Sequence, residues 1–162
     1  MGVGTGFFLD KCQFHTSRPI LALADLNPNS LQVTAKRLER YDPETYIANV
    51  WEPLPIDAKF DSIGINYLFH CLPGNFRSQG VVFQNLKTLL NKNGGVIFGT
   101  TILGIGIQRN FLAKILMRVY NAKGIFHNTY DHAADLERVL KENFLDYTIR
   151  IERCVAFFAG RI

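Results

Sequence analysis

The sequence predicts an α/β fold built on a mostly parallel sheet. Strand signals and helix signals alternate along all 162 residues, which is the pattern of such a fold. Hydrophobic residues make up 48% of the chain and charged residues 20%, enough for one globular domain with a sizeable core. No internal repeat or low-complexity linker interrupts the alternation. We therefore expect residues 1–162 to form a single domain.

The first half of the chain begins with a glycine-rich turn and continues with short alternating elements. The expected elements are a helix over residues 7–15, a buried strand over 20–24 (ILALA), a helix over 29–40 and a strand over 45–48. Asn27 and Pro28 supply the cap and the early proline of the second helix. Leu31, Ala35 and Leu38 recur at helical spacing, so this face should pack on the sheet.

The second half continues the alternation after an irregular segment that contains Pro53 and Pro55, since proline removes a backbone donor. The expected elements are strands over 62–68 and 96–101, helices over 78–90, 108–121 and 133–143, and an antiparallel pair over 147–153 and 155–160. The apolar stripe of the helix over 108–121 could face a membrane or a dimer partner, but we expect core packing. Its members are Phe111, Ile115, Leu116 and Val119.

Charge and cysteine content exclude several classes of protein. The net charge is +4, but Lys and Arg are spread through the chain without a long basic run, so we expect no nucleic-acid partner. Cys12, Cys71 and Cys154 are odd in number and form no CxxC pair, which predicts neither a metal site nor disulfides and favours the cytoplasm. No apolar run reaches the ~20 residues that span a bilayer, so we expect no membrane partner.

A glycine loop and a later acidic residue carry the chemistry. Gly2, Gly4 and Gly6 let the backbone approach a ligand closely, directly before a helix whose N–H groups favour a polar ligand group. Asp25 follows about 20 residues later at the end of a strand, where an acid can accept hydrogen bonds from both ribose hydroxyls. The alternatives are an ordinary strand-to-helix turn and an Asp25 that only caps the next helix.

The glycine spacing separates two ligand classes. A dinucleotide site needs glycine at the third place of G-x-G-x-x-G, which here is Phe7, and a large aromatic side chain there blocks close helix packing. The observed G-x-G-x-G therefore favours S-adenosylmethionine.

Four segments resemble, in order, the motifs of class I S-adenosylmethionine-dependent methyltransferases. They are residues 2–6 (GVGTG), 23–27 (LADLN), 60–66 (FDSIGIN) and 89–98 (LLNKNGGVIF). The resemblance implies that the glycine loop, with Thr5, holds the methionine moiety and that Asp25 holds the ribose. It also implies roles for Leu26 at the adenine face, for Asn49 with Val50 or Trp51 at the adenine edge, and for Asn66, Tyr67 and Leu68 near the sulfonium and the substrate.

Several of these residues have simpler interpretations. Asn49 could satisfy its own turn, and Trp51, the only tryptophan, could cover the edge of the core. His70 lies just past a strand, where a general base could reach a substrate hydroxyl, although loop histidines are more often bystanders. We take Tyr67 and His70 as the candidate catalytic residues. Tyr130 and His132 lie in a segment that the resemblance assigns to the substrate pocket.

The resemblance implies a three-layer Rossmann-like sandwich with strand order 3-2-1-4-5-7-6 and an antiparallel strand 7. The family has a hydrophobic strand directly before the glycine loop, where this sequence has only Met1. We therefore expect strand 1 to be missing or vestigial and the amino-terminal cap of the family to be absent. A parallel sheet without its middle strand leaves backbone groups unpaired, which is costly.

The implied function is methyl transfer from S-adenosylmethionine to a small-molecule acceptor, by a monomer or a homodimer. One alternative is a truncated or non-catalytic methyltransferase-like protein that acts through an interface. Another is a nicotinamide-dependent oxidoreductase. Phe7 and the lack of a Tyr-x-x-x-Lys pair argue against this class of enzyme. A nucleic-acid methyltransferase is disfavoured because residues 66–69 read NYLF and not an NPPY-like tetrad.

Overall fold

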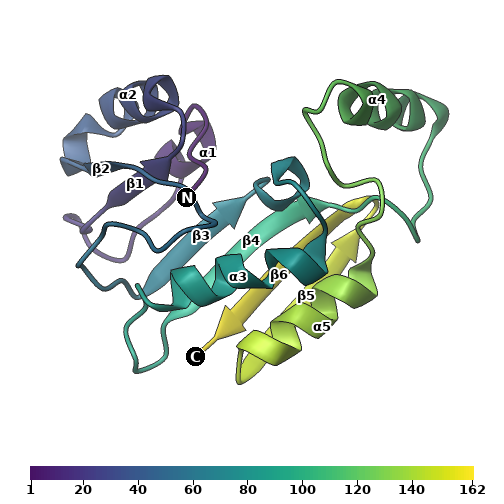
Figure 1. The fold of residues 1–162 in the computed structure, drawn as a ribbon. Coiled ribbons are helices and arrows are strands. Elements are labelled where there is room, and N and C mark those ends of the chain that lie inside the picture. Colours follow the sequence, from purple (N-terminus) through teal and green to yellow (C-terminus); the bar gives the residue numbers. More distant parts are fainter. The chain divides into compact units, whose positions relative to one another are not determined.

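The computed structural model describes all 162 residues and has the α/β architecture that the sequence predicts (Figure 1). The chain divides into two compact units, Met1–Ile56 and Asp57–Ile162, called here the N-terminal and the C-terminal unit. Each is described by itself. The expectation of a single domain over residues 1–162 stays a prediction.

The N-terminal unit contains a two-stranded parallel sheet with one main helix. Its elements are α1 (Phe7–Asp10), β1 (Ala22–Asp25), α2 (Pro28–Arg37), the 3-10 helix η1 (Glu39–Tyr41) and β2 (Glu44–Ile47). Strand β1 pairs with β2 from Ala22 opposite Glu44 to Asp25 opposite Ile47. The connection through α2 is the βαβ unit that a parallel pair requires.

The core of the N-terminal unit is a small leucine cluster. Leu23 of β1 packs with Leu31 and Leu38, which confirms the predicted helix face. Asn27 caps α2 as expected, because its side-chain oxygen accepts a hydrogen bond from the N–H of Asn29 at 3.0 Å. Pro28 follows at the first helical position, where its missing N–H costs nothing.

Two predictions in the N-terminal unit are wrong in extent. Helix α1 ends at Asp10 and does not reach His15; none of its residues is buried, and a short helix without a packed face is marginal in water. The strand expected from Ile20 begins at Ala22, and Ile20 is 84% exposed. The parallel partner begins only at Glu44, so Ile20 lies outside the ladder.

The C-terminal unit contains a mixed four-stranded sheet. Its elements are β3 (Ser62–Asn66), the 3-10 helix η2 (Phe69–Cys71), α3 (Phe76–Lys87), β4 (Val96–Ile102), α4 (Phe111–Ala122), α5 (Ala133–Asn143), β5 (Asp146–Glu152) and β6 (Val155–Arg161). The strand order is β3-β4-β6-β5, with β3 parallel to β4 and β6 antiparallel to both of its neighbours. The predicted antiparallel closing pair is therefore confirmed.

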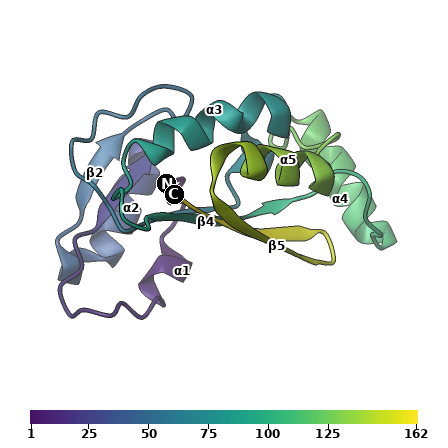
Figure 2. The ribbon, with the colours of Figure 1, turned by 90° about the horizontal axis from the view of Figure 1, so that it is seen from below.

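Helices α3 and α5 lie on the same face of this sheet (Figure 2). Between them and the strands is an aromatic core in which the ring of Phe69 lies 5.0 Å from that of Phe83 and 5.8 Å from that of Phe158. Helix α3 begins with a capping box, in which Asn75 accepts from the N–H of Ser78 and the Ser78 side chain accepts from the N–H of Asn75.

Each sheet reproduces one part of the expected 3-2-1-4-5-7-6 order. The N-terminal sheet reads β2-β1, as expected for strands 3 and 2, and the C-terminal sheet reads β3-β4-β6-β5, as expected for strands 4, 5, 7 and 6. Beside β1, the N–H of Gly2 donates a backbone hydrogen bond to the carbonyl of Ala24 at 2.9 Å.

Helix α4 contradicts the sequence-based expectation of core packing. No residue of α4 is buried, and its apolar stripe is exposed, led by Phe111 at 75% and Leu112 at 74%. Helical spacing identifies which residues share a face, but it cannot tell what covers that face.

None of the helices combines the length and the apolar character that a bilayer-spanning segment requires.

Candidate cofactor and acceptor sites

The glycine loop adopts the backbone conformation for which glycine is needed. Gly2, Gly4 and Gly6 have φ angles of 66°, 54° and 67°, all in the left-handed region. A Cβ added at Gly6 would lie 2.6 Å from Cγ2 of Thr34, so α2 packs directly against the loop. A Cβ added at Gly4 would meet nothing within 4 Å, so that part of the loop is open.

Two side chains of α2 hold the loop from one side. The buried hydroxyl of Thr34 donates a hydrogen bond to the Gly4 carbonyl at 3.1 Å, and Nε of Arg37 donates to the Thr5 carbonyl at 2.9 Å. Both loop carbonyls are thereby turned toward α2. Sequence reasoning did not identify Thr34 or Arg37, since their partners are backbone atoms about 30 residues away.

Asp25 ties the end of β1 to the loop. Its Oδ2 accepts the N–H of Val3 at 2.8 Å and its Oδ1 accepts the N–H of Asn27 at 2.9 Å. Because each carboxylate oxygen can accept two hydrogen bonds, one acceptor position on each oxygen remains for another donor. The alternative that Asp25 caps α2 is wrong, since Asn27 does so.

The free donors nearest to Asp25 lie in the loop and continue into the first turn of α1, which has no side-chain cap. The N–H groups of Gly4 and Thr5 donate to no protein acceptor, whereas those of Gly2, Val3 and Gly6 are bonded within the unit. Helix α1 has only four residues, so the expected contribution of its amino-terminal dipole is small. Two adjacent free N–H groups suit a carboxylate or another anionic group.

The segment after β2 is arranged less simply than expected. Asn49 closes its own turn, accepting the N–H of Trp51 at 3.2 Å and donating to Glu52 at 3.1 Å. The Val50 side chain is buried in the core, while Trp51 is half-buried. Leu26, beside Asp25, is exposed and available to a flat ligand face.

In the C-terminal unit, β3 ends in a strained turn that carries two of the predicted site residues. Oδ1 of Asn66 accepts a hydrogen bond from the Thr100 hydroxyl at 3.2 Å, which fixes the amide at the strand end. Tyr67 has a φ of 56°, uncommon for a residue with a side chain, and its N–H donates to the Thr100 carbonyl at 2.7 Å. Such strain is often found at functional sites.

His70 lies next to Tyr67 but is not an exposed base. It is 3% exposed, with its ring 5.9 Å from that of Tyr67 and 4.6 Å from that of Phe126. Its Nδ1 has no hydrogen-bond partner. Burial lowers the pKa of His70 to about 4, so the imidazole is neutral near pH 7 and a weak proton acceptor.

Asp131 is a buried carboxyl group that sequence reasoning missed. It is 1% exposed, and neither carboxylate oxygen has a hydrogen-bond partner. Burial, assisted by the nearby charge of Asp135, raises the pKa of Asp131 to about 7. Its carbonyl accepts the N–H groups of Gly104 and Ile105. The only sequence signal was its position directly before a helix, which does not distinguish a buried acid from an exposed one.

Tyr130 and His132, the candidates on either side of Asp131, differ in exposure and in hydrogen bonding. Tyr130 is exposed. Nδ1 of His132 accepts the N–H of Ala134 at 3.0 Å, so this side chain is the N-cap of α5. The structure thus gives His132 a structural role at the helix start.

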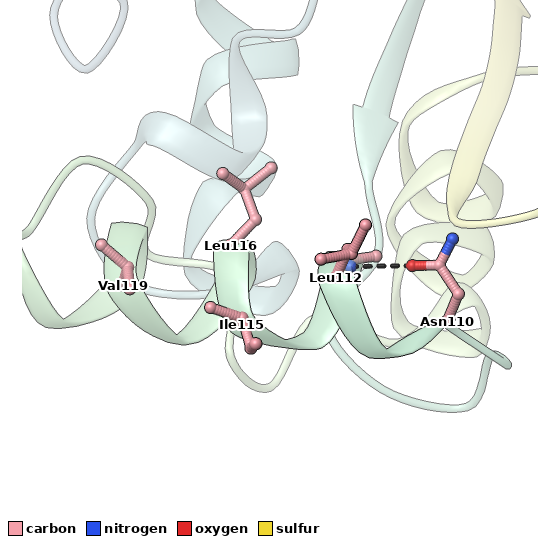
Figure 3. Close-up of a pocket in the computed structure, with 6 residues that line it drawn as sticks. Asn110, Leu112, Ile115, Leu116 and Val119 are labelled. Carbon is pink, nitrogen blue, oxygen red and sulfur yellow. Dashed lines mark hydrogen bonds between the residues drawn. The ribbon is translucent and has the colours of Figure 1, made fainter.

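The surface depressions include two open ones that contain no predicted site residue. One, of about 340 Å³, is lined by residues of α2 and β2. The other, of about 530 Å³, is lined only by Asn110 and residues of α4 (Figure 3). A depression formed by a single helix cannot enclose a small ligand in the way a cofactor pocket does.

Comparison with known proteins agrees with this architecture. No protein-family model matches the sequence. The chain is 40% identical over 159 residues to demethylluteothin O-methyltransferase of Streptomyces thioluteus, covering 98% of this chain and 69% of the relative.

Solved structures share the fold at lower sequence identity. An O-methyltransferase family protein from Burkholderia thailandensis superimposes with a TM-score of 0.74 at 16% identity, covering 99% of this chain but only 48% of that structure. The N-methyltransferase NodS from Bradyrhizobium japonicum, in complex with S-adenosyl-L-homocysteine, gives a TM-score of 0.66 at 14% identity, covering 98% of this chain and 74% of that one.

The chain belongs to the methyltransferase family, and its fold is that of the class I S-adenosylmethionine-dependent enzymes. The predicted family and the predicted Rossmann-like α/β fold class are confirmed. The roles of the individual site residues stay predictions.

Proposed function

We propose that the chain binds S-adenosylmethionine through the glycine loop and Asp25 and transfers its methyl group to a small-molecule acceptor. The observation that carries the proposal is the connection of Asp25 to the loop through the Val3 N–H at 2.8 Å. This bond fixes the only carboxylate at the end of β1 beside the only free loop donors of Gly4 and Thr5.

The polar groups present fit the chemistry of this cofactor. The free N–H groups of Gly4 and Thr5 suit its methionine carboxylate, and the remaining acceptor positions of Asp25 suit two ribose hydroxyls. The absence of any atom within 4 Å of a Cβ built at Gly4 leaves space for a ligand on the loop. Leu26, exposed beside Asp25, would contact the adenine face.

The residues of this chain would act mainly by positioning. When bound, S-adenosylmethionine supplies a methyl group that is already activated by the sulfonium charge, so an aligned acceptor needs little further catalysis. By the family resemblance, Asn66, whose amide is held by Thr100, is proposed as a cofactor residue and Tyr67 and His70 as acceptor residues. Tyr67 is exposed and would meet the acceptor directly, whereas the buried His70 would support the Tyr67 ring, which lies 5.9 Å from its own.

The acceptor and the cellular setting are also proposals. The name of the Streptomyces relative, an O-methyltransferase, supports an oxygen atom on a small molecule as the methyl acceptor. The three free cysteines support a reducing compartment, which we propose to be the cytoplasm. A homodimer is compatible with this function but is not needed for it.

The first experiment is calorimetric titration of the full chain with S-adenosylhomocysteine. We expect micromolar binding by the wild type and a loss of about 100-fold or more in Asp25→Ala, because two hydrogen bonds to a charged group are lost and each contributes about 1.5–3 kcal/mol. Glu39→Ala is the matched control: it removes one exposed negative charge from the same unit and makes no contact with the loop.

Thermal melting of each protein identifies loss of fold. Absence of binding by a wild-type protein that melts cooperatively would reject the proposed function and favour a non-catalytic relative. Equal affinities of the wild type and Asp25→Ala would reject the role of Asp25. Preference for a nicotinamide dinucleotide would instead support the oxidoreductase alternative.

A further inference from the structure

The apolar stripe of α4 is exposed, and no residue of this helix is buried. With Leu112 added, the stripe consists of Phe111, Leu112, Ile115, Leu116 and Val119, all of them exposed. Figure 3 shows the last four of these along the helix. Their i, i+1, i+4, i+5, i+8 spacing places them on one side of the helix. Contiguous exposed apolar surface of this kind marks an interaction site more often than chance.

The opposite side of α4 is held by its own unit, so the stripe stays turned outward. Asn121 donates a hydrogen bond to the side-chain oxygen of the buried Asn128 at 3.1 Å, and the Asn128 amide in turn donates to the Ile102 carbonyl of β4 at 2.7 Å. The ring of Tyr120 packs edge-on against Phe126 at 5.0 Å. Both contacts come from residues of the helix that are only half-buried, and neither involves the stripe.

The sequence segment that contains α4 carries only positively charged side chains. Residues 104–130 contain Arg109, Lys114, Arg118 and Lys123 and no Asp or Glu. The rest of the chain carries 14 basic and 14 acidic side chains, so this segment accounts for the whole net charge of +4. Lys114 and Arg118 follow Phe111 and Ile115 by three residues each, which places them along the border of the stripe.

We propose that α4 docks on an anionic lipid surface, with the apolar stripe at the boundary of headgroups and acyl chains and Lys114 and Arg118 at the lipid phosphates. An exposed apolar face bordered by basic side chains is the pattern of helices that lie in the membrane interface. The long basic side chains can reach the headgroups while their methylene stems stay beside the stripe. This proposal does not depend on methyl transfer.

Other occupants fit less well. A small molecule would remain mostly exposed on a convex helix face. A second copy would bring two segments of net charge +4 together without an acidic residue in either, which opposes association. The expectation of no membrane partner was based on the absence of a spanning segment, but a helix that lies in the interface plane needs no such length.

The test is co-sedimentation of the full chain with phosphatidylcholine vesicles that contain or lack phosphatidylserine. We expect binding only to the vesicles with phosphatidylserine, weakened by salt. Phe111→Ser/Leu112→Ser should weaken it strongly. Lys114→Glu/Arg118→Glu should weaken it by roughly 30-fold or more, since each basic residue near an anionic surface contributes about 1 kcal/mol, or about fivefold, and the introduced carboxylates add repulsion.

Matched controls are Leu145→Ser and Lys141→Glu, which change exposed residues of the same unit outside α4; Leu145 is 92% exposed. They should bind like the wild type. No binding by folded wild type, or binding unchanged in both α4 variants, would overturn the proposal. A second result would also overturn it: the wild type does not bind vesicles but forms a dimer in analytical ultracentrifugation, and Phe111→Ser/Leu112→Ser abolishes that dimer. This result would identify a second copy of the chain as the occupant.

Discussion

Thr34 shows how a single residue can control the conformation of the glycine loop. Its hydroxyl donates to the Gly4 carbonyl at 3.1 Å, and its methyl group limits Gly6 to a residue without Cβ. We predict that Thr34→Val weakens S-adenosylhomocysteine binding about fivefold, because a hydrogen bond of about 1 kcal/mol that positions the loop is lost while the packing stays. Titration calorimetry measures this change.

The conservative variant separates positioning from packing. Thr34→Ser keeps the hydroxyl and should retain most of the affinity, whereas Thr45→Val, an exposed threonine of β2, should behave like the wild type. If the wild type binds and Thr34→Val binds equally well, the hydroxyl does not position the loop. That result would leave the role of Asp25 intact.

Asp131 makes stability depend on pH in an unusual direction. Its raised pKa means that the folded state holds a proton which the unfolded state releases between about pH 4 and pH 7. The contribution of Asp131 to the free energy of unfolding is therefore fully present at the lower pH. It decreases by at most about 4 kcal/mol as pH rises through this range.

We predict that Asp131→Asn, which stays neutral, removes this dependence and melts at a higher temperature than the wild type at pH 8. His70 has the opposite sign, since its lowered pKa costs stability only below about pH 6.5. The difference in melting temperature between Asp131→Asn and the wild type, followed from pH 5 to pH 8, therefore isolates Asp131, because both proteins contain the same His70. A wild-type melting temperature that stays constant between pH 5 and pH 8, with no gain in Asp131→Asn, would contradict the assignment.

At the scale of elements, the sequence patterns correctly predicted the features that depend on neighbouring residues in the chain. Helix α5 has the predicted bounds of 133–143, because its apolar face is buried on the sheet. The cap at Asn27 and the glycine loop were also predictable, since both depend on neighbouring residues. Patterns failed where the outcome depends on distant contacts: α1 is shorter than expected, and the stripe of α4 is exposed.

The same distinction applies to the candidate site. The position of Asp25 at the end of a strand was predictable from the apolar run before it, but its bond to Val3 was not. His70 was chosen as a base by type and position, whereas its burial among Tyr67 and Phe126 comes from the tertiary fold. Asp131 was missed because burial of an acid leaves no mark on the sequence.

At the scale of the whole molecule, the two units differ in how well their strands are paired. Strand β1 has four residues and pairs only with β2, while β4 has seven and is paired on both sides. A small sheet with a core of a few leucines is marginally stable. We therefore predict, by hydrogen exchange of the full chain, at least about tenfold lower protection for amides of β1 than of β4.

Ligand binding should then act selectively. If the glycine loop and Asp25 bind S-adenosylhomocysteine, saturating ligand should raise the protection of β1 and of residues 2–6, by up to about 100-fold at a concentration of 100 times Kd, because the ligand must dissociate before this region opens. Amides of β4 should change less, since their exchange does not require opening of the loop. Equal protection of β1 and β4 in the free protein would contradict the prediction, because it would mean that both units open only together.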